Sequence, residues 1–289
     1  MVTTETVEVK ITETIKSQSV LNNMNELIEN GYFLLEDVID TKLIEEIKSC
    51  ICEKLVKLGA PTGLHFSEQY KQLSKNIHPY QINLHLMREI VFAEFPKRIL
   101  NTSAILESFI HIVGVDLAYE MNSELPVNIK DEKNDSLIKK FHQEFWTGAG
   151  NRTYSFWAPI VMEKGAGTMD MIKKSHLWGH IPHQNREPKW LPEDAEIVNI
   201  QCKEGDALIF SPLTLHRTAR NMADCPRLAY TTTVRNVFEE DTGFDRMKNW
   251  EIFHLGAAAK ILKKLGNPHL SPFRTYGSAR IPIDSSKYS

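Results

Sequence analysis

Hydrophobic positions in the first third of the chain recur with the three- and four-residue spacing of amphipathic helices. The clearest stripe runs through residues 43–58, preceded by Asp40 as an N-cap and followed by Gly59, which favours termination. Shorter stripes predict helices over residues 20–28 and 103–113. We expect the helix at 43–58 to pack its apolar face on a sheet, whereas the helix at 103–113 carries two adjacent apolar stripes.

From residue 115 onward the pattern is mainly that of short strands. Residues 153–162 alternate most clearly, with Tyr154 and Phe156 on one face and Ser155 and Trp157 on the other. Further extended segments are predicted at 32–38, 115–121, 127–130, 195–202, 207–210, 213–217 and 227–238.

Two segments lack a clear strand pattern. Residues 60–80 carry Pro and Gly without clear periodicity, so we expect a surface loop there, either a lid over a cleft or an ordinary connection. Residues 239–289 are mixed, with one short helix expected around 250–265 and a tail after it.

Many short strands with turn signals, preceded by helices, predict a mainly β fold with flanking helices. The expected architecture is a double-stranded β-helix, the jelly-roll type of barrel found in cupins. We expect an N-terminal arm at 1–18 and one domain over 19–289, with a metal-binding core at about 136–238.

Composition narrows the classes of partner. Hydrophobic residues make up 42% and charged residues 25% of the 289 positions, which is ordinary for a chain that buries a sizeable core. The net charge of −3 predicts neither nucleic-acid nor membrane binding. The polar start and the lack of a long apolar run predict a cytoplasmic protein. Four cysteines without a C-x-x-C spacing are expected to remain reduced.

Candidate metal chemistry lies in the second half of the chain. Of the eleven histidines, only His142 has an acidic residue two positions on, Glu144. If this segment is a strand, both side chains share one face while Gln143 turns away. With His216 they supply the two imidazoles and one carboxylate that hold Fe(II) on one side and leave positions for oxygen and an organic co-substrate.

A second group of histidines offers a rival metal site. His176, His180 and His183 lie close in sequence and in principle form a zinc site. However, Gly179 and Pro182 interrupt the helix that such a spacing requires, and no Glu stands between the first two histidines. We therefore expect these histidines in a loop near the cleft mouth.

The candidate residues belong to a longer series of motifs, and in their joint order these resemble the phytanoyl-CoA dioxygenase family of Fe(II)/2-oxoglutarate oxygenases. The shared motifs are Asn30-Gly31-Tyr32-Phe33-Leu34-Leu35-Glu36, His142-Gln143-Glu144, Phe156-Trp157-Ala158, Ser175-His176-Leu177-Trp178-Gly179, Gly205-Asp206 with Phe210, and His216-x-Thr218-x-x-Asn221 with Arg227.

The resemblance implies a role for each matching residue. His142, Glu144 and His216 are implied as Fe(II) ligands. Arg227 is implied as the partner of the 2-oxoglutarate C5 carboxylate, with Thr218 and Trp157 beside that co-substrate. It also implies the reaction, in which O2 and 2-oxoglutarate give succinate and CO2 while a small organic molecule is hydroxylated or desaturated.

Arg227 has a second interpretation from the sequence alone. It begins a strand that we expect beside the strand carrying His216, so that its guanidinium reaches into the barrel and pairs with a carboxylate. The alternative is an ordinary surface salt bridge.

The chain departs from the family pattern at two positions. Glu144 stands where the family usually has Asp, and Lys174 where it usually has Gly. Because Glu144 occupies the position that a halogenase leaves for halide, hydroxylation or desaturation is favoured over halogenation. Two other functions stay open: a cupin-type metal enzyme that does not use 2-oxoglutarate, and a non-catalytic binding barrel. No segment indicates a pocket for coenzyme A, so a phytanoyl-CoA substrate does not follow from the resemblance.

Overall fold

The computed structural model describes residues 18–121, 123–130, 139–147, 150, 152–239 and 250–265. Most of the expected N-terminal arm lies outside these residues, as does the tail beyond 265. The division into an arm at 1–18 and one domain at 19–289 therefore stays a prediction.

The helices predicted from the hydrophobic stripes are present. One spans residues 18–30, α2 spans Thr41–Lys57 and α6 spans Ser103–Val113. Asp40 caps α2 as expected, because its carboxylate accepts a hydrogen bond of 2.7 Å from the backbone N–H of Lys42. Along the described parts of the chain, none of the helices combines the length and apolarity needed to cross a membrane.

The expectation of a loop at residues 60–80 is wrong. Helix α3 (Phe66–Ser74) lies there, and α4 (Pro79–Phe92) and α5 (Phe95–Leu100) follow it. Tyr70 is fully buried in the core that α2 and α4 share. The sequence pattern did not show where α3 and α4 begin. Their N-cap residues are His65 and His78, and α4 begins at Pro79. These residue types also occur in loops, so the pattern was ambiguous.

The strands form two main sheets. The large sheet has the order β1-β9-β4-β11-β2-β12, with β3 paired to β11, and the small sheet has the order β10-β5-β8. Within each of these sheets, all neighbouring strands pair antiparallel. The strand bounds are β1 Tyr32–Leu35, β2 Leu117–Glu120, β3 Val127–Asn128, β4 Tyr154–Val161, β5 Met169–Ile172, β8 Ile197–Ile200, β9 Ala207–Phe210, β10 His216–Thr218, β11 Arg227–Asn236 and β12 Trp250–His254.

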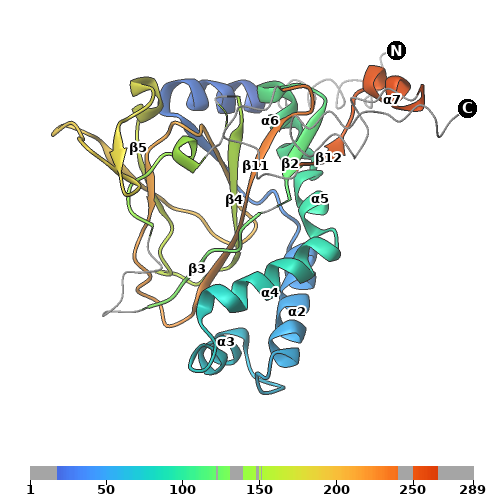
Figure 1. Cartoon of the computed structure of the whole chain (residues 1–289), viewed down its shortest axis with the longest axis vertical. Coiled ribbons are helices and arrows are strands. Elements are labelled where there is room, and N and C mark those ends of the chain that lie inside the picture. The colour runs from blue at the N-terminus through green and yellow to red at the C-terminus, as the bar shows by residue number, and fades with distance from the viewer. Residues whose placement is uncertain are drawn as a thin grey trace, which may run out of the picture.

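Shorter elements complete the fold. They are the 3-10 turns η2 (Glu144–Thr147) and η3 (Ser175–Trp178), the two-residue strands β6 (His183–Gln184) and β7 (Glu187–Pro188), and helix α7 (Ala257–Lys264). In Figure 1 the helices α2 to α5 lie on one side of β4 and β11, and β5 of the small sheet lies on the other side. Two facing sheets with helices outside match the predicted fold class.

The alternation along β4 decides where the core and the cavity lie. Phe156, Ala158 and Ile160 belong to the main hydrophobic core, which the helices cover, and the ring of Phe156 lies 6.2 Å from that of Phe109 in α6. Trp157 belongs to a second, smaller cluster between the two sheets. One strand thus separates the helical layer from the interior of the barrel.

The expectation of one helix around residues 250–265 is half wrong. Only α7 is helical, because Trp250–His254 is strand β12 at the edge of the large sheet, where Trp250 pairs with Glu120. Burial of the Trp250 ring, and the guanidinium of Arg235 4.0 Å from its centroid, favour the strand over the local helical pattern. All four cysteines are free thiols, as their spacing predicts.

The turn at 204–206 immediately precedes β9 and binds the backbone of the segment that follows β1. Gly205 has φ +92°, and its carbonyl accepts hydrogen bonds from the backbone N–H groups of Val38 and Ile39. The buried carboxylate of Asp206 accepts two more, from the N–H of Asp37 at 2.9 Å and that of Lys203 at 2.8 Å. This turn therefore attaches the first strand to the centre of the sheet.

Asp206→Ala is expected to lower the free energy of unfolding by about 3 kcal/mol, because two charge-assisted hydrogen bonds to backbone N–H groups are lost. Chemical denaturation measures the change. The control is Asp194→Ala, which removes an exposed carboxylate and is expected to change stability by less than about 0.5 kcal/mol. Equal stability of the two variants would contradict the anchoring role of Asp206.

Candidate metal centre

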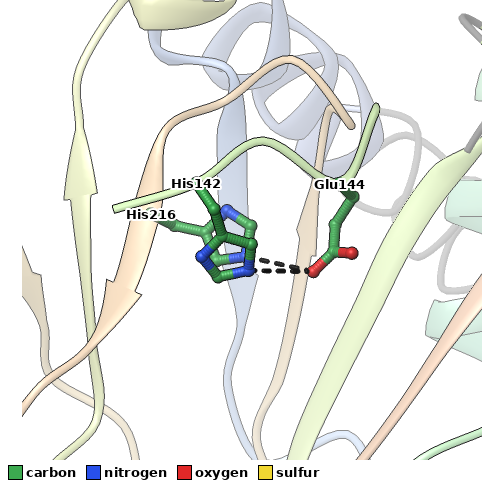
Figure 2. A group of neighbouring side chains, drawn as sticks. All are labelled: His142, Glu144 and His216. Carbon is green, nitrogen blue, oxygen red and sulfur yellow. Dashed lines mark ion pairs between the residues drawn. The ribbon is translucent and has the colours of Figure 1, made fainter. Parts of the chain in front are cut away.

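Three side chains from two distant segments of the chain converge between the two sheets. The Nε2 atoms of His142 and His216 lie 3.4 and 3.3 Å from the same carboxylate oxygen, Oε1 of Glu144 (Figure 2). The three donor atoms lie within 4.8 Å of one another, and no other group of this kind occurs among the described residues. The structure therefore brings together the three ligands that the sequence predicts.

The local backbone differs from the expected strand. His142 forms only an isolated antiparallel bridge with His216, in which each backbone N–H donates to the other carbonyl at 3.0 and 3.1 Å. Glu144 already belongs to the 3-10 turn η2, so the prediction of one strand carrying both ligands is wrong. The bridge sets the two imidazole centroids 4.2 Å apart, and the turn directs the Glu144 carboxylate back toward them.

Backbone carbonyls orient both imidazoles. Nδ1 of His142 lies 2.7 Å from the carbonyl oxygen of Lys140, and Nδ1 of His216 lies 2.9 Å from that of Thr214. Each Nδ1 therefore donates a proton outward, which leaves Nε2 as the ligand atom, as is usual for metal-binding histidines. Nε2 of His142 is buried and makes no hydrogen bond, so the donor set fits a divalent iron ion.

The charge states of these groups also suit a cation. Burial acts to raise the pKa of Glu144, but the two imidazoles and Lys139 outweigh it and hold that pKa well below its usual range. Burial, reinforced by the neighbouring His142 ring, lowers the pKa of His216. At neutral pH the carboxylate is therefore ionised and the His216 imidazole neutral, which are the forms that bind a metal.

Gln143 lies between the ligands and turns away from them, as predicted. Its buried amide nitrogen donates to the carbonyl oxygens of Gly179 at 2.9 Å and Leu213 at 2.7 Å, and its oxygen accepts from the N–H of Ile181 at 3.1 Å. Three hydrogen bonds to two other segments therefore fix the backbone on which both neighbouring ligands sit.

The triad opens into a cavity of about 320 Å³, within the size range of small-molecule sites. Arg227, Trp157 and Thr218 line the same cavity, and no residue of 60–80 does, so that segment supplies no lid.

The strand arrangement around Arg227 differs from the expectation. Arg227 lies on β11 of the large sheet whereas His216 lies on β10 of the small one, so the two residues line one cavity from different sheets instead of occupying adjacent strands.

Arg227 is a buried cation, with only 2% of the residue exposed. Its Nε donates to the carbonyl oxygen of Gly167 at 3.2 Å and its Nη1 to that of Pro126 at 3.4 Å, and the guanidinium carbon lies 5.4 Å from the ring centroid of Trp157. No carboxylate among the described residues pairs with it, so the surface salt bridge is excluded. Burial lowers the pKa of Arg227 to about 10, which leaves it charged at neutral pH.

Other residues that line the cavity were not singled out from the sequence. Ser155 precedes Trp157 by two positions, and the alternation of β4 places both on the cavity side. Glu120, Thr233 and Lys139 also line the cavity, but they come from three other segments. Only the pairing of those segments shows that they meet.

The rival histidine group does not form a metal site. Nε2 of His176 lies 3.0 Å from the carbonyl oxygen of Ile28, and the His183 ring stacks on Trp146 with a centroid distance of 4.5 Å. Lys174 has a left-handed φ of +61°, which accounts for the glycine that the family usually has at this position and does not explain the lysine. Glycine adopts that conformation without the cost of about 1 kcal/mol that other residues incur.

Comparison with known proteins was made on the sequence and on the fold. The model of the family described as phytanoyl-CoA dioxygenase (PhyH) matches residues 27–229, more than half of the chain.

Solved structures with the same fold share about one residue in seven with this chain. A non-haem monooxygenase, ThoJ in its apo form, has a TM-score of 0.57 at 15% identity, covering 80% of this chain and 83% of that one. The epimerase SnoN, in complex with Fe3+, alpha ketoglutarate and nogalamycin RO, has a TM-score of 0.53 at 15% identity, with coverage of 79% and 88%. EctD from S. alaskensis, with 2-oxoglutarate and 5-hydroxyectoine, has a TM-score of 0.52 at 15% identity, with coverage of 75% and 76%. These similarities confirm the predicted fold.

Gln143→Leu is expected to weaken Fe(II) binding about 10- to 100-fold, because the ligand-bearing backbone loses its three supporting hydrogen bonds. Anaerobic equilibrium titration measures the affinity. Gln69→Leu is the matched control, since Gln69 is equally buried and donates to the carbonyl of Pro61 in the helical layer. Both variants are expected to lose stability, and only Gln143→Leu to lose affinity. Equal Fe(II) affinity in the two variants would show that Gln143 has no positioning role.

Proposed function

This chain belongs to the phytanoyl-CoA dioxygenase family and is a non-haem Fe(II)- and 2-oxoglutarate-dependent dioxygenase, and on that premise we propose that it hydroxylates or desaturates a small organic molecule at a centre built by His142, Glu144 and His216. One observation carries this assignment of residues. A triad with its donor atoms turned inward shares one cavity with Arg227, a buried cation that has no carboxylate partner among the described residues.

The bound iron, with O2 and 2-oxoglutarate, supplies the oxidising chemistry, in which succinate and CO2 are released as a substrate C–H bond is oxidised. His142 and His216 would each contribute an Nε2 atom to the metal, and Glu144 would contribute a carboxylate oxygen. Three protein ligands would leave the remaining positions for the co-substrate and oxygen. With its carboxylate in place the centre keeps no position for halide, which favours hydroxylation or desaturation over halogenation.

Arg227 binds the C5 carboxylate of 2-oxoglutarate in this proposal. A planar guanidinium forms two parallel hydrogen bonds with a carboxylate, and the energy of that pair is largest in a site that excludes water. Trp157 covers the guanidinium on one side, and Thr218 brings a hydroxyl group to the same cavity. The chain thus holds a buried positive charge for which the co-substrate supplies the missing anion.

The two other functions are less well supported. A cupin-type enzyme that ignores 2-oxoglutarate has no use for the buried charge of Arg227, which is costly to keep unpaired. A non-catalytic barrel has no use for an inward-facing triad. A small-molecule substrate is supported by the neighbouring folds, since SnoN was solved with nogalamycin RO and EctD with 5-hydroxyectoine.

Anaerobic addition of Fe(II) and 2-oxoglutarate is expected to produce a charge-transfer band in the visible spectrum, because the co-substrate chelates the metal in the triad. His142→Ala should abolish the band, since one ligand is lost. His111→Ala is the control, because His111 lies exposed on α6, hydrogen-bonds to the backbone carbonyl of Glu107 and does not line the cavity. Bound iron without a band would favour the cupin-type enzyme.

Arg227→Met is expected to have opposite effects on ligand binding and on stability. Loss of the guanidinium should raise the dissociation constant of 2-oxoglutarate about 100-fold, since a charge-assisted pair is removed. The ligand-free protein should keep its stability or gain about 1 kcal/mol, since an apolar side chain replaces a buried unpaired charge.

The matched control is Arg98→Met, which breaks an exposed ion pair with Glu46 and should leave 2-oxoglutarate affinity unchanged. Calorimetric titration measures affinity, and denaturation of the ligand-free protein measures stability. If Arg227→Met binds 2-oxoglutarate as the native protein does, Arg227 is not the carboxylate partner.

A further inference from the structure

The wall of the cavity that faces the triad carries a row of polar side chains. In the large sheet Ser155 of β4 pairs with Thr233 of β11 on one side and with Phe210 of β9 on the other. Val234 of β11 pairs with Tyr119 of β2, so the adjacent residue Thr233 is level with Glu120. All four residues, Glu120, Ser155, Phe210 and Thr233, line the cavity. We call Glu120, Thr233 and Ser155 the polar row.

The polar row is level with the metal centre. The ring of Phe210, next to Ser155 in the sheet, packs against the imidazole of His216 with a centroid distance of 4.7 Å. Because neighbouring strands lie about 4.8 Å apart, Ser155 is one strand away from the residue that contacts a ligand. A molecule held by the polar row is therefore beside the triad.

The polar row is separate from the co-substrate site. Arg227 and Thr233 are six residues apart on β11, which corresponds to about 20 Å along an extended strand. The pair formed by Trp157 and Thr231 lies between them. With 2-oxoglutarate extending from the triad toward Arg227, the polar row remains for the molecule that is oxidised.

Ser155 marks this wall as a binding surface. Only 3% of the residue is exposed, and its Oγ is buried without any hydrogen-bond partner, although it borders the cavity. A buried hydroxyl group without a partner costs free energy, so such groups are uncommon in folded proteins. A ligand that fills the cavity supplies the missing partner.

The cavity wall indicates the chemical class of that ligand. Among the lining residues that the structure describes, the apolar ones are Pro126, Val127, Trp157, Met169 and Phe210, and none is Leu or Ile. Hydroxyl groups and carboxylates occupy the wall where a fatty chain needs aliphatic contacts. An alkyl chain there would leave the Ser155 hydroxyl without a hydrogen bond and would give no new hydrogen bond to the other polar groups.

We propose that Ser155, together with Thr233 and Glu120, binds a hydroxyl or amino group of the primary substrate and so selects a small hydrophilic molecule over a fatty acyl chain. Hydroxyls donate and accept, and the carboxylate accepts, which suits a ligand group that carries hydrogen-bond donors. Ser155 is a positioning residue: it fixes the polar group so that a nearby carbon faces the metal. This inference rests on the proposed function.

The first experiment compares two fractions of a cell extract separated on a reversed-phase column. One is the unretained hydrophilic fraction, and the other is the retained fraction supplemented with octanoyl-CoA and palmitoyl-CoA. Succinate formation by the Fe(II)-loaded protein with 2-oxoglutarate is expected to be stimulated by the hydrophilic fraction only. Stimulation by the retained fraction alone, or by neither fraction, overturns the proposal.

The second experiment uses variants of the polar row. Ser155→Ala and Thr233→Val each remove one hydroxyl group with little change in volume, and each should need about 3- to 10-fold more hydrophilic fraction for half-maximal stimulation. Ser108→Ala is the matched control, because Ser108 is a buried serine that donates to the carbonyl of Ala104 in α6, away from the cavity. A native response in both row variants overturns the proposal.

A spectroscopic measurement distinguishes a failure of the proposed dioxygenase function from a failure of the proposed substrate class. The visible band with Fe(II) and 2-oxoglutarate is recorded on the same native protein before any extract is added. Absence of the band is a failure of the proposed function, whatever the extract does. A band together with stimulation by acyl-CoA leaves that function intact and rejects the hydrophilic substrate.

Discussion

The backbone bridge between His142 and His216 is the interaction on which the site depends. Two hydrogen bonds of 3.0 and 3.1 Å join segments that are 74 residues apart in sequence. They place both imidazoles in register, and the carbonyls of Lys140 and Thr214 then fix which nitrogen faces inward. Without the bridge His142 and Glu144 lie outside both sheets, whereas His216 begins β10 of the small sheet.

Burying the polar groups of the site makes the free energy of folding less favourable, and apolar burial in the rest of the molecule offsets this effect. A buried guanidinium without a carboxylate partner and an unpartnered serine hydroxyl both oppose folding unless ligands are bound. The compensating burial lies elsewhere, where α2, α3 and α4 pack their apolar faces and cover the large sheet. Stability and chemistry are therefore divided between the two sides of one sheet.

Strand β4 shows how one short sequence serves both sides. Its residues alternate between Phe156, Ala158 and Ile160 toward the helices and Ser155 and Trp157 toward the cavity. Because a shift of one residue would exchange the two faces, the apolar core fixes which side chains line the cavity. The packing of the helical layer thus sets the register of the binding surface.

The sequence by itself determined the features that depend on local pattern. These are the capped helix α2, the stripe of α6, the alternation of β4, and the types of side chain needed for a metal and for a carboxylate. The order of those candidate residues along the chain also resembled that of the phytanoyl-CoA dioxygenase family, and this resemblance implied Fe(II) and 2-oxoglutarate. Local periodicity and residue chemistry are properties of short segments, so they can be recognised without knowing what packs against them.

Only the tertiary structure decided which segments meet. The sequence placed Arg227 in a strand beside His216, yet the two lie in facing sheets. It also described 60–80 as a loop and 250–254 as helix, where burial and pairing produce α3 and β12. The polar row is formed from β2, β4 and β11, whose pairing no local pattern specifies. Strand pairing is a long-range choice made by the whole core, which is why it overrides the preferences of single segments.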